Sequence, residues 1–197
     1  GTDISVGAIM AVSAAVCFNI LTGGERAVTA YANPLILGFI AALVVGAAIG
    51  CFNGFLVSKL NIQPMVATLI MFTAGRGIAQ LITDGQITYV RVDSYRVLGA
   101  SFPGFPVPTP FIVAVLVVAL TSLLLKKTAL GMYIQSVGIN KRASQLVGIK
   151  SVLIIFLTYA YCGLCSGLAG LIASSRIYSA DANNIGLNME LDAIPVS

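Results

Sequence analysis

Polar side chains that could contact a solute are rare in this chain, and several of them share one side of an apolar segment. Thr73, Arg76, Gln80 and Thr83 follow one another at spacings of three, four and three residues within the apolar stretch 65–83, which places them on one face of a helix. An arginine in mid-membrane costs at least about 2.5–3.5 kcal/mol, so its side chain should face a helix bundle, a partner or a watery cavity. Thr73, Arg76 and Gln80 are therefore candidates for a translocation pathway.

Other interpretations of this polar stripe stay open. Arg76 could extend along the helix to the interface or belong to a structural hydrogen-bond network. Asp3, at the edge of the first apolar segment, and Asn53, within the second, also join the candidate pathway. Asn19 is of the same kind as Asn53, but amides between helices often serve packing alone.

Residues for catalysis or metal binding are missing from the sequence. It contains no histidine and no G-x-x-x-x-G-K-[ST] phosphate loop, so it offers neither the usual general base nor that route to ATP binding. Its cysteines lie inside apolar runs, and the C-x-x-C spacing of Cys162 and Cys165 lacks the cationic neighbour that would activate a thiolate. We expect no catalytic residue, no metal site and no cofactor, and hence a protein that is not an enzyme.

The composition indicates a membrane protein. Hydrophobic residues make up 58% of the 197 and charged residues 9%, against about 25% charged residues in soluble domains. Apolar segments long enough to be spans of about 20 residues recur along the chain, and only helices satisfy the backbone of such runs in lipid. We predict an all-α, polytopic transmembrane helical bundle that forms a single domain over 1–197. Its five expected spans are 4–21, 35–58, 65–83, 111–125 and 152–174.

The charges in the connections predict how these spans are oriented. Segment 126–151 holds five basic residues and no acid, and Lys59 follows the second span. The other three connections combine basic residues with acids: 22–34, 84–110 and 175–197. By the positive-inside rule, 126–151 and the turn after Lys59 are cytoplasmic, whereas the other three connections are external.

The external connection 84–110 ends in a run with four prolines between Phe102 and Pro110. Proline lacks the backbone donor and disfavours regular helix, so we expect a stiff loop. This loop is either a structural connector or a contact surface for an external partner.

Small residues at four-residue intervals predict where two helices pack closely. The second span carries Gly38, Ala42, Gly46, Gly50, Gly54 and Ser58, and the fifth carries Gly163 and Gly167. Such faces let backbones approach in lipid, where no hydrophobic force drives association. We therefore expect Gly46, Gly50, Gly54, Gly163 and Gly167 to lie in helix interfaces.

The cytoplasmic segment 126–151 predicts a short amphipathic helix. Asn140 can cap it, Ala143 can contribute to its apolar face, and Gly148 can end it. Such a helix suits insertion into a groove on a cytoplasmic partner. Interfacial anchoring in the membrane is the alternative, but few bulky apolar residues support it.

Three motifs resemble the permeases of ribose-, xylose- and galactose-type sugar importers of the ATP-binding-cassette class. Asp3-Ile4-Ser5-Val6-Gly7 resembles the family's D-L-S-V-G, and Asn53-Gly54 with Ile62 to Leu69 resembles its N-G…I-x-P-x-[VI]-A-T-L. Segment 138–149 resembles its cytoplasmic G-x-N-x-x-A-A…G-I, with Ser144 in place of the second alanine. Stretches 74–83, 127–132 and 180–184 look closest to galactofuranose importer permeases.

This resemblance implies a permease that moves a monosaccharide across the bacterial inner membrane by alternating access. Its implied partners are a cytoplasmic ATPase that binds the ATP, a periplasmic sugar-binding protein and a second permease subunit. Coupling to the ATPase would run through the cytoplasmic loop, and the candidate residues there are Gly131, Gly138, Asn140, Arg142, Ala143 and Gly148.

A transporter or channel driven by an ion gradient is the alternative function. Carboxylates or histidines inside the spans would favour it, but Asp3 and Asp84 lie at span edges. We also expect the chain to be a fragment of a longer protein, because Gly1-Thr2-Asp3 runs straight into an apolar stretch without a basic n-region.

Overall fold

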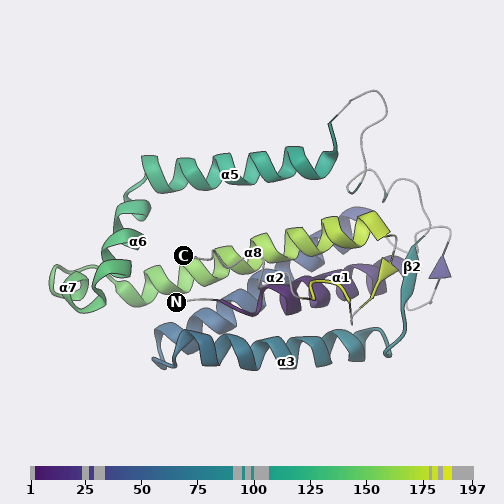
Figure 1. The fold of residues 1–197 in the computed structure, drawn as a ribbon, viewed down its shortest axis with the longest axis horizontal. Helices are drawn as coiled ribbons and strands as arrows, with labels where there is room; N and C mark the ends of the chain where they lie inside the picture. Colours follow the sequence, from purple (N-terminus) through teal and green to yellow (C-terminus); the bar gives the residue numbers. More distant parts are fainter. Residues whose placement is uncertain are drawn as a thin grey trace.

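The computed structural model describes residues 3–23, 27–28, 34–90, 95, 99, 107–177, 179–181 and 184–187. These residues form seven helices and three short strands (Figure 1). The helices are α1 (Val6–Thr22), α2 (Leu35–Ser58), α3 (Pro64–Ile82), α5 (Thr109–Lys127), α6 (Ala129–Ile139), α7 (Lys141–Leu146) and α8 (Ser151–Ile177). The strands are β1 (Ala27–Val28), β2 (Thr88–Val90) and β3 (Ser179–Ala180).

The expected helical bundle is confirmed, and its helices match the five apolar segments. Four of them, α2, α3, α5 and α8, are long and apolar enough to cross a membrane. The fourth apolar segment is lengthened by Thr109 and Pro110, because proline is well tolerated in the first turn of a helix. Among the five helices that match the predicted spans, α1 is the shortest, with 17 residues, which is at the lower limit of a spanning helix.

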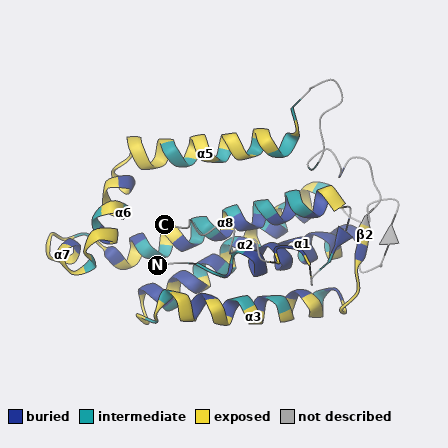
Figure 2. Cartoon of the chain, in the orientation of Figure 1, coloured by how far each residue is buried: buried dark blue, intermediate teal, exposed yellow. Residues whose placement is uncertain are grey.

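Helix α1 is the centre of the bundle. It packs against α2, α3 and α8 and is buried along nearly its whole length, as Figure 2 shows. It begins partway along α8 rather than level with the end of that helix (Figure 1). The polar residues just before it therefore lie among neighbouring helices.

Helices α2 and α8 approach each other through their glycines. A Cβ added at Gly50 would lie 2.5 Å from the carbonyl oxygen of Tyr159, and one added at Gly46 would lie 2.8 Å from that of Gly163. Gly54 lies against the backbone of Phe156, and a Cβ added at Gly167 would lie 3.4 Å from the carbonyl oxygen of Ala42. Close backbone contact of this kind requires residues without side chains.

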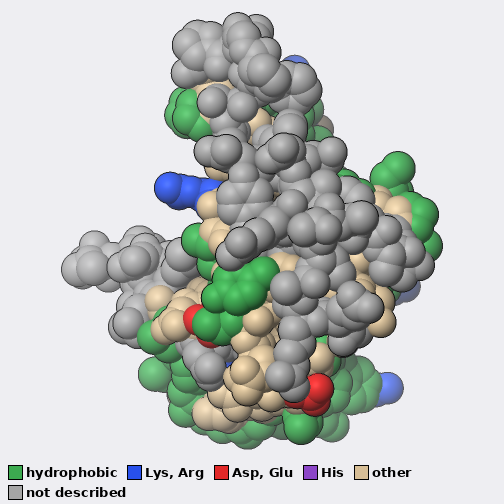
Figure 3. Space-filling view, turned by 90° about the vertical axis from the view of Figure 1, so that its right-hand side faces the viewer, with side chains coloured by type: hydrophobic (Ala, Val, Ile, Leu, Met, Phe, Trp, Pro, Cys, Tyr) green, Lys and Arg blue, Asp and Glu red, His purple; other side chains and the backbone are tan. Residues whose placement is uncertain are grey.

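The connections predicted to be external meet at one end of the bundle. Strand β2 pairs in parallel with β1 and antiparallel with β3, with Thr88 opposite Ala180. This sheet joins segments that follow α1, α3 and α8, and it was not predicted, since strands of two or three residues carry no periodicity. Seen from this end in Figure 3, few charged side chains show among the described residues, and apolar ones cover the lower part, over α3.

Helix α5 stands apart from the bundle (Figure 1) and has no buried residue. A hydrogen bond joins it to α8, between the Thr121 hydroxyl and the Tyr161 hydroxyl at 2.5 Å. At its far end it continues into α6 and α7, opposite to the sheet. The 126–151 segment thus lies at the other end of the molecule from the 84–90 segment, as the predicted alternation requires.

Candidate functional site

A hydrogen-bonded polar cluster surrounds the beginning of α1. The Asp3 carboxylate accepts hydrogen bonds from the Ser5 amide at 2.9 Å and the Ser5 hydroxyl at 2.7 Å. The Ser5 hydroxyl also accepts a bond from the Asn53 side-chain amide at 2.8 Å. Residues from α2 and from the segment before α1 are therefore joined inside an otherwise apolar bundle.

Helix α3 completes this cluster through Thr68. The Thr68 hydroxyl accepts a hydrogen bond from the Ile4 amide at 3.2 Å and donates to the Pro64 carbonyl at 3.0 Å. Ser5, Asn53 and Thr68 are each 0% exposed. Buried polar groups without hydrogen bonds are costly, so these bonds hold α1, α2 and α3 in register.

One acceptor in the cluster remains available. Among the described residues, the side-chain oxygen of Asn53 has no hydrogen-bond partner and is shielded from solvent. The Asp3 carboxylate lies beside Tyr159 and Cys162 of α8. The cluster therefore contains hydroxyl, amide and carboxylate groups at a point where all four central helices meet, and such groups could bond to the hydroxyls of a polar solute.

The structure divides the candidate pathway residues between two places. Asp3 and Asn53 belong to the cluster, whereas Thr73 and Gln80 are exposed on the outer face of α3. The Thr73 hydroxyl donates to the Ile70 carbonyl of its own helix at 2.9 Å. Arg76 is partly buried, and its guanidinium lies 5.2 Å from the centre of the Phe72 ring, a cation–π distance.

Two further polar residues near the sheet end have structural contacts. The Asn19 side chain donates to the Ile82 carbonyl at 3.1 Å and so links α1 to α3. The Thr83 hydroxyl donates to the Ala79 carbonyl at 3.0 Å. Both residues are thereby engaged with the ends of helices.

Segment 126–151, which the sequence predicts to be cytoplasmic, contains two helices, α6 and α7, where the sequence predicted one. Asn140 caps α7 as expected: its side-chain oxygen accepts hydrogen bonds from the amides of Arg142 and Ala143, both at 3.1 Å. Gly148 follows α7 with φ of 87°, a left-handed conformation that favours glycine. Helix α6 was not predicted, because it precedes the Asn140 cap and its own N-cap, Thr128, makes no side-chain capping hydrogen bond.

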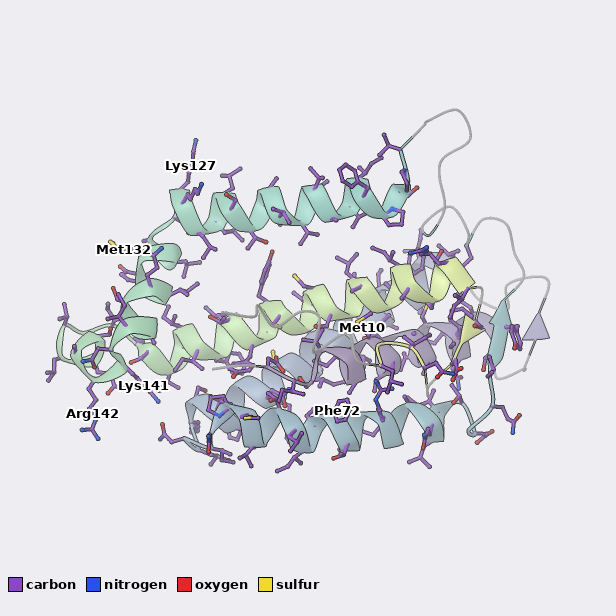
Figure 4. The ribbon with its side chains drawn as sticks, in the orientation of Figure 1. Met10, Phe72, Lys127, Met132, Lys141 and Arg142 are labelled. Atoms are coloured by element: carbon purple, nitrogen blue, oxygen red, sulfur yellow. The ribbon has the colours of Figure 1, made fainter. Side chains whose placement is uncertain are left out.

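The outer surface of this helix pair is apolar and basic. Ile139, Leu146 and Val147 are 88%, 90% and 81% exposed, and Arg142 points away from the bundle in Figure 4. Ala143 is exposed and Gly138 has open space around it. Exposed apolar side chains of this size beside basic groups suit contact with another protein.

Gly131 and Ser144 differ from this exposed set. Gly131 is buried, and a Cβ there would collide with the backbone of Leu125, so this glycine allows the turn between α5 and α6. Ser144 is 5% exposed and its hydroxyl donates to the Asn140 carbonyl at 3.0 Å. The inner face of α7 is therefore formed by a serine.

A polar contact connects α7 to the bundle. The Lys141 ammonium donates to the side-chain oxygen of Asn61 at 2.8 Å. Asn61 lies in the turn between α2 and α3 and has a φ of 52°, a left-handed conformation that asparagine tolerates better than most residues. A displacement of α7 would therefore be transmitted through this hydrogen bond to the end of α2 and the beginning of α3.

Sequence reasoning missed several of these residues. Ser5 and Thr68 were not candidates, since one hydroxyl in an apolar run is a weak signal, although their positions fall within the quoted motifs. Tyr95 is 0% exposed, packs edge-on against Phe18 at 5.2 Å and bonds the Ser174 hydroxyl at 2.8 Å. Tyr95 falls within the predicted connection 84–110, where nothing in the sequence indicated this burial.

The described residues contain no group of histidine, cysteine and acidic side chains that could hold a metal ion. The four cysteines are free thiols.

Comparisons with known proteins relate this chain to membrane permeases. The profile of the family described as branched-chain amino acid transport system / permease component matches residues 1–197. The galactofuranose transporter permease of Escherichia coli (strain K12) is 47% identical over 194 residues, which cover 98% of this chain and 54% of that protein. No solved structure matches the chain.

Two other relatives also carry sugar names. The fructose import permease of Bifidobacterium longum (strain NCC 2705) is 42% identical over 201 residues, 98% of this chain and 53% of the relative. The ribose import permease of Escherichia coli (strain K12) is 35% identical over 198 residues, 98% of this chain and 59% of the relative. The chain thus spans somewhat more than half the length of these relatives.

Proposed function

This chain belongs to the branched-chain amino acid transport system / permease component family, and we propose that it is the membrane-spanning part of an ATP-binding-cassette importer that translocates a monosaccharide. The proposal rests on one observation above all: three permeases named for galactofuranose, fructose and ribose each align with 98% of the chain. The family description itself names branched-chain amino acids, so the substrate class has to be tested directly.

The polar cluster and the cytoplasmic helices support a mechanism of coupled movement. Asn61, which holds Lys141 of α7, lies eight residues after Asn53 and seven before Thr68. At 1.5 Å per helical residue, Asn53 lies about 7.5 Å from the end of α2 and Thr68 about 6 Å from the beginning of α3, the two helix ends that this turn connects. A partner that moves α7 would shift both helices, and with them the hydrogen bonds around Ser5.

The proposed partners follow from the ends of the molecule. A cytoplasmic ABC ATPase would dock on α6 and α7, bind the ATP and hydrolyse it, since translocation by this chain needs no catalytic residue of its own. A periplasmic sugar-binding protein would deliver the sugar at the sheet end, and a second permease subunit would complete the assembly. The location is the bacterial inner membrane, which the chain crosses several times.

A double substitution on the exposed surface of α6 and α7 tests the proposal. Gly138→Trp with Ala143→Asp changes two open positions, so the permease should still fold. A carboxylate on a surface that is buried by a partner costs several kcal/mol when unpaired. We expect loss of ATPase copurification and of sugar uptake, with normal amounts of permease in the membrane.

The control and the substrate test use the same membranes. Gly77→Ala, on the exposed face of α3 with no atom near the added Cβ, should keep ATPase binding and uptake. Radiolabelled ribose, fructose, galactofuranose and leucine are compared as substrates. Uptake of leucine alone would contradict the sugar assignment, and uptake by the double variant that persists until an ionophore collapses the proton gradient would favour an ion-driven transporter.

A further inference from the structure

A cavity of about 490 Å³ opens at the cytoplasmic end of the bundle, between the end of α2 and the beginning of α8. One part of its lining is basic and polar, with Lys59, Lys150 and Ser151. Another part is apolar, with Phe55 and Phe156. The polar cluster around Ser5 is separate from this cavity, whereas Gln145 of α7 and the following Gly148 form one edge of its lining.

The polar part of the cavity is suited to an anion. Helix α8, of 27 residues, begins at Ser151 and has no acidic residue in its first turn, so its dipole favours negative charge there. Two of its first amides are already engaged, since the Ser151 amide donates to the Ile149 carbonyl at 2.8 Å and the Ile154 amide to the Lys150 carbonyl at 3.2 Å. Lys59 and Lys150 add two positive charges, and segments 34–82 and 107–177 contain no acid. These two segments supply every lining residue, and the Asp3 carboxylate lies further along α8, beside Tyr159 and Cys162.

The Ser151 hydroxyl supplies a second, independent indication of a ligand. Ser151 is 1% exposed, and its oxygen has no hydrogen-bond partner among the described residues. A buried hydroxyl left without a partner is costly, because it has given up its bonds to water. An oxygen of a phosphate group at the start of α8 would supply the missing acceptor.

The apolar part indicates where this phosphate comes from. The Lys59 ammonium lies 5.5 Å from the centre of the Phe55 ring, and the neighbouring Val152 and Leu153 are 42% and 50% exposed. Lys59 follows α2 and Lys150 precedes α8, so both are at the ends of candidate spans. A basic site bordered by exposed apolar side chains at this level matches a phospholipid, with a charged head and acyl chains.

We propose that this cavity is a binding site for an anionic phospholipid of the cytoplasmic leaflet. The phosphate of the lipid lies at the beginning of α8, between Lys59 and Lys150, and accepts a hydrogen bond from Ser151. Its acyl chains follow Phe55 and Phe156 along α2 and α8. Free phosphate shares the head-group chemistry but makes no use of the apolar side.

Fluorescence quenching by brominated lipids tests this proposal on the intact protein in vesicles without other subunits. The 197 residues contain no tryptophan, so Phe156→Trp places a reporter in the cavity. Vesicles of phosphatidylcholine receive the same small fraction of either brominated phosphatidylglycerol or brominated phosphatidylcholine. We expect stronger quenching by the anionic lipid, and a loss of relative affinity of about fivefold for each lysine removed in Lys59→Gln and Lys150→Gln.

Two matched variants make the result decisive. Lys126→Gln with Lys127→Gln removes two charges from the end of α5, outside the cavity, and should preserve the preference. Val152→Glu places an acid in the first turn of α8, which favours the helix but repels a phosphate, and should abolish the preference in a folded protein.

Three results would overturn the proposal. The first is equal quenching by the two lipids in the reporter protein. The second is a preference that survives both Val152→Glu and the double change at Lys59 and Lys150. The third is loss of the preference in millimolar inorganic phosphate, which would assign the cavity to a free anion. Loss of ATPase copurification in the same variants, without any lipid preference, would instead assign the cavity to a protein partner.

Discussion

Replacement of Gly50 by alanine should destabilise the contact between α2 and α8. Gly50 lies where α2 crosses α8, and its added Cβ would lie 2.5 Å from the Tyr159 carbonyl oxygen and 2.9 Å from the Gly163 Cα. Both obstacles are backbone atoms of a helix, which cannot rotate away as a side chain could. The two helices must therefore separate.

The size of this separation sets the expected cost. Ordinary contact begins at 3.4 Å, so relief of the closest approach requires about 0.9 Å, from 3.4 minus 2.5. A shift of this size loosens the neighbouring contacts of Gly46 and Gly163 as well. Insertion of a methyl group into a packed core costs about 1–3 kcal/mol, and alanine regains roughly 1 kcal/mol of helix propensity. A net loss of up to about 2 kcal/mol follows.

Thermal unfolding in detergent measures this loss, with Gly77→Ala as the matched control. The control adds the same methyl group to a helical glycine with nothing within 4 Å, so it should leave the melting temperature unchanged or raise it through helix propensity. Gly50→Ala should lower the melting temperature relative to both the unaltered protein and the Gly77→Ala control. Equal melting temperatures for the two variants would refute the close contact between α2 and α8.

Three other predictions concern the ends of the bundle. Tyr95→Phe removes the hydroxyl bond to α8 but keeps the ring, so the free energy of unfolding should fall by about 1 kcal/mol in chemical denaturation; no change would mean that this bond is not formed. Asn61→Ala deletes the acceptor of Lys141, and we expect ATPase binding to persist while sugar uptake falls several-fold, whereas unchanged uptake would argue against transmission through the turn between α2 and α3. Cysteines at Gln145 and Gln86, both exposed, should label from the cytoplasmic and external sides respectively in a background without native cysteines, and labelling from one side would contradict the orientation.

Long apolar runs allowed the spanning helices to be predicted, because lipid leaves the backbone few alternatives to helix. Local signals also sufficed for the cap of α7, where Asn140 needs only the next three residues. The position of α1 could not be predicted in this way: its apolar residues look like those of α2, yet it is enclosed on nearly all sides. Central burial depends on which helices surround it, and periodicity does not record that.

The candidate site was predicted in part for a related reason. Asp3 and Asn53 stood out because charged and amide groups are expensive in lipid, but their common partner Ser5 is a small residue in an apolar run. The Ser5 hydroxyl is important because it bonds to Asn53, which lies 48 positions away in the sequence. Similarly, Tyr95 is buried through contacts with α1 and α8, and because both helices are far from it in sequence, its neighbours along the chain did not indicate this burial.

The small sheet has a mechanical consequence for the whole molecule. By pairing the segments after α1, α3 and α8, it holds these three helices together at one end of the bundle. At the opposite end the described residues form no sheet, and the hydrogen bond from Lys141 to Asn61 connects α7 to the turn between α2 and α3. Helices that are held together at one end can rotate about that end, so a small rotation about the sheet gives a larger displacement towards α6 and α7. A partner that acts on α6 and α7 therefore acts at the greatest distance from the sheet.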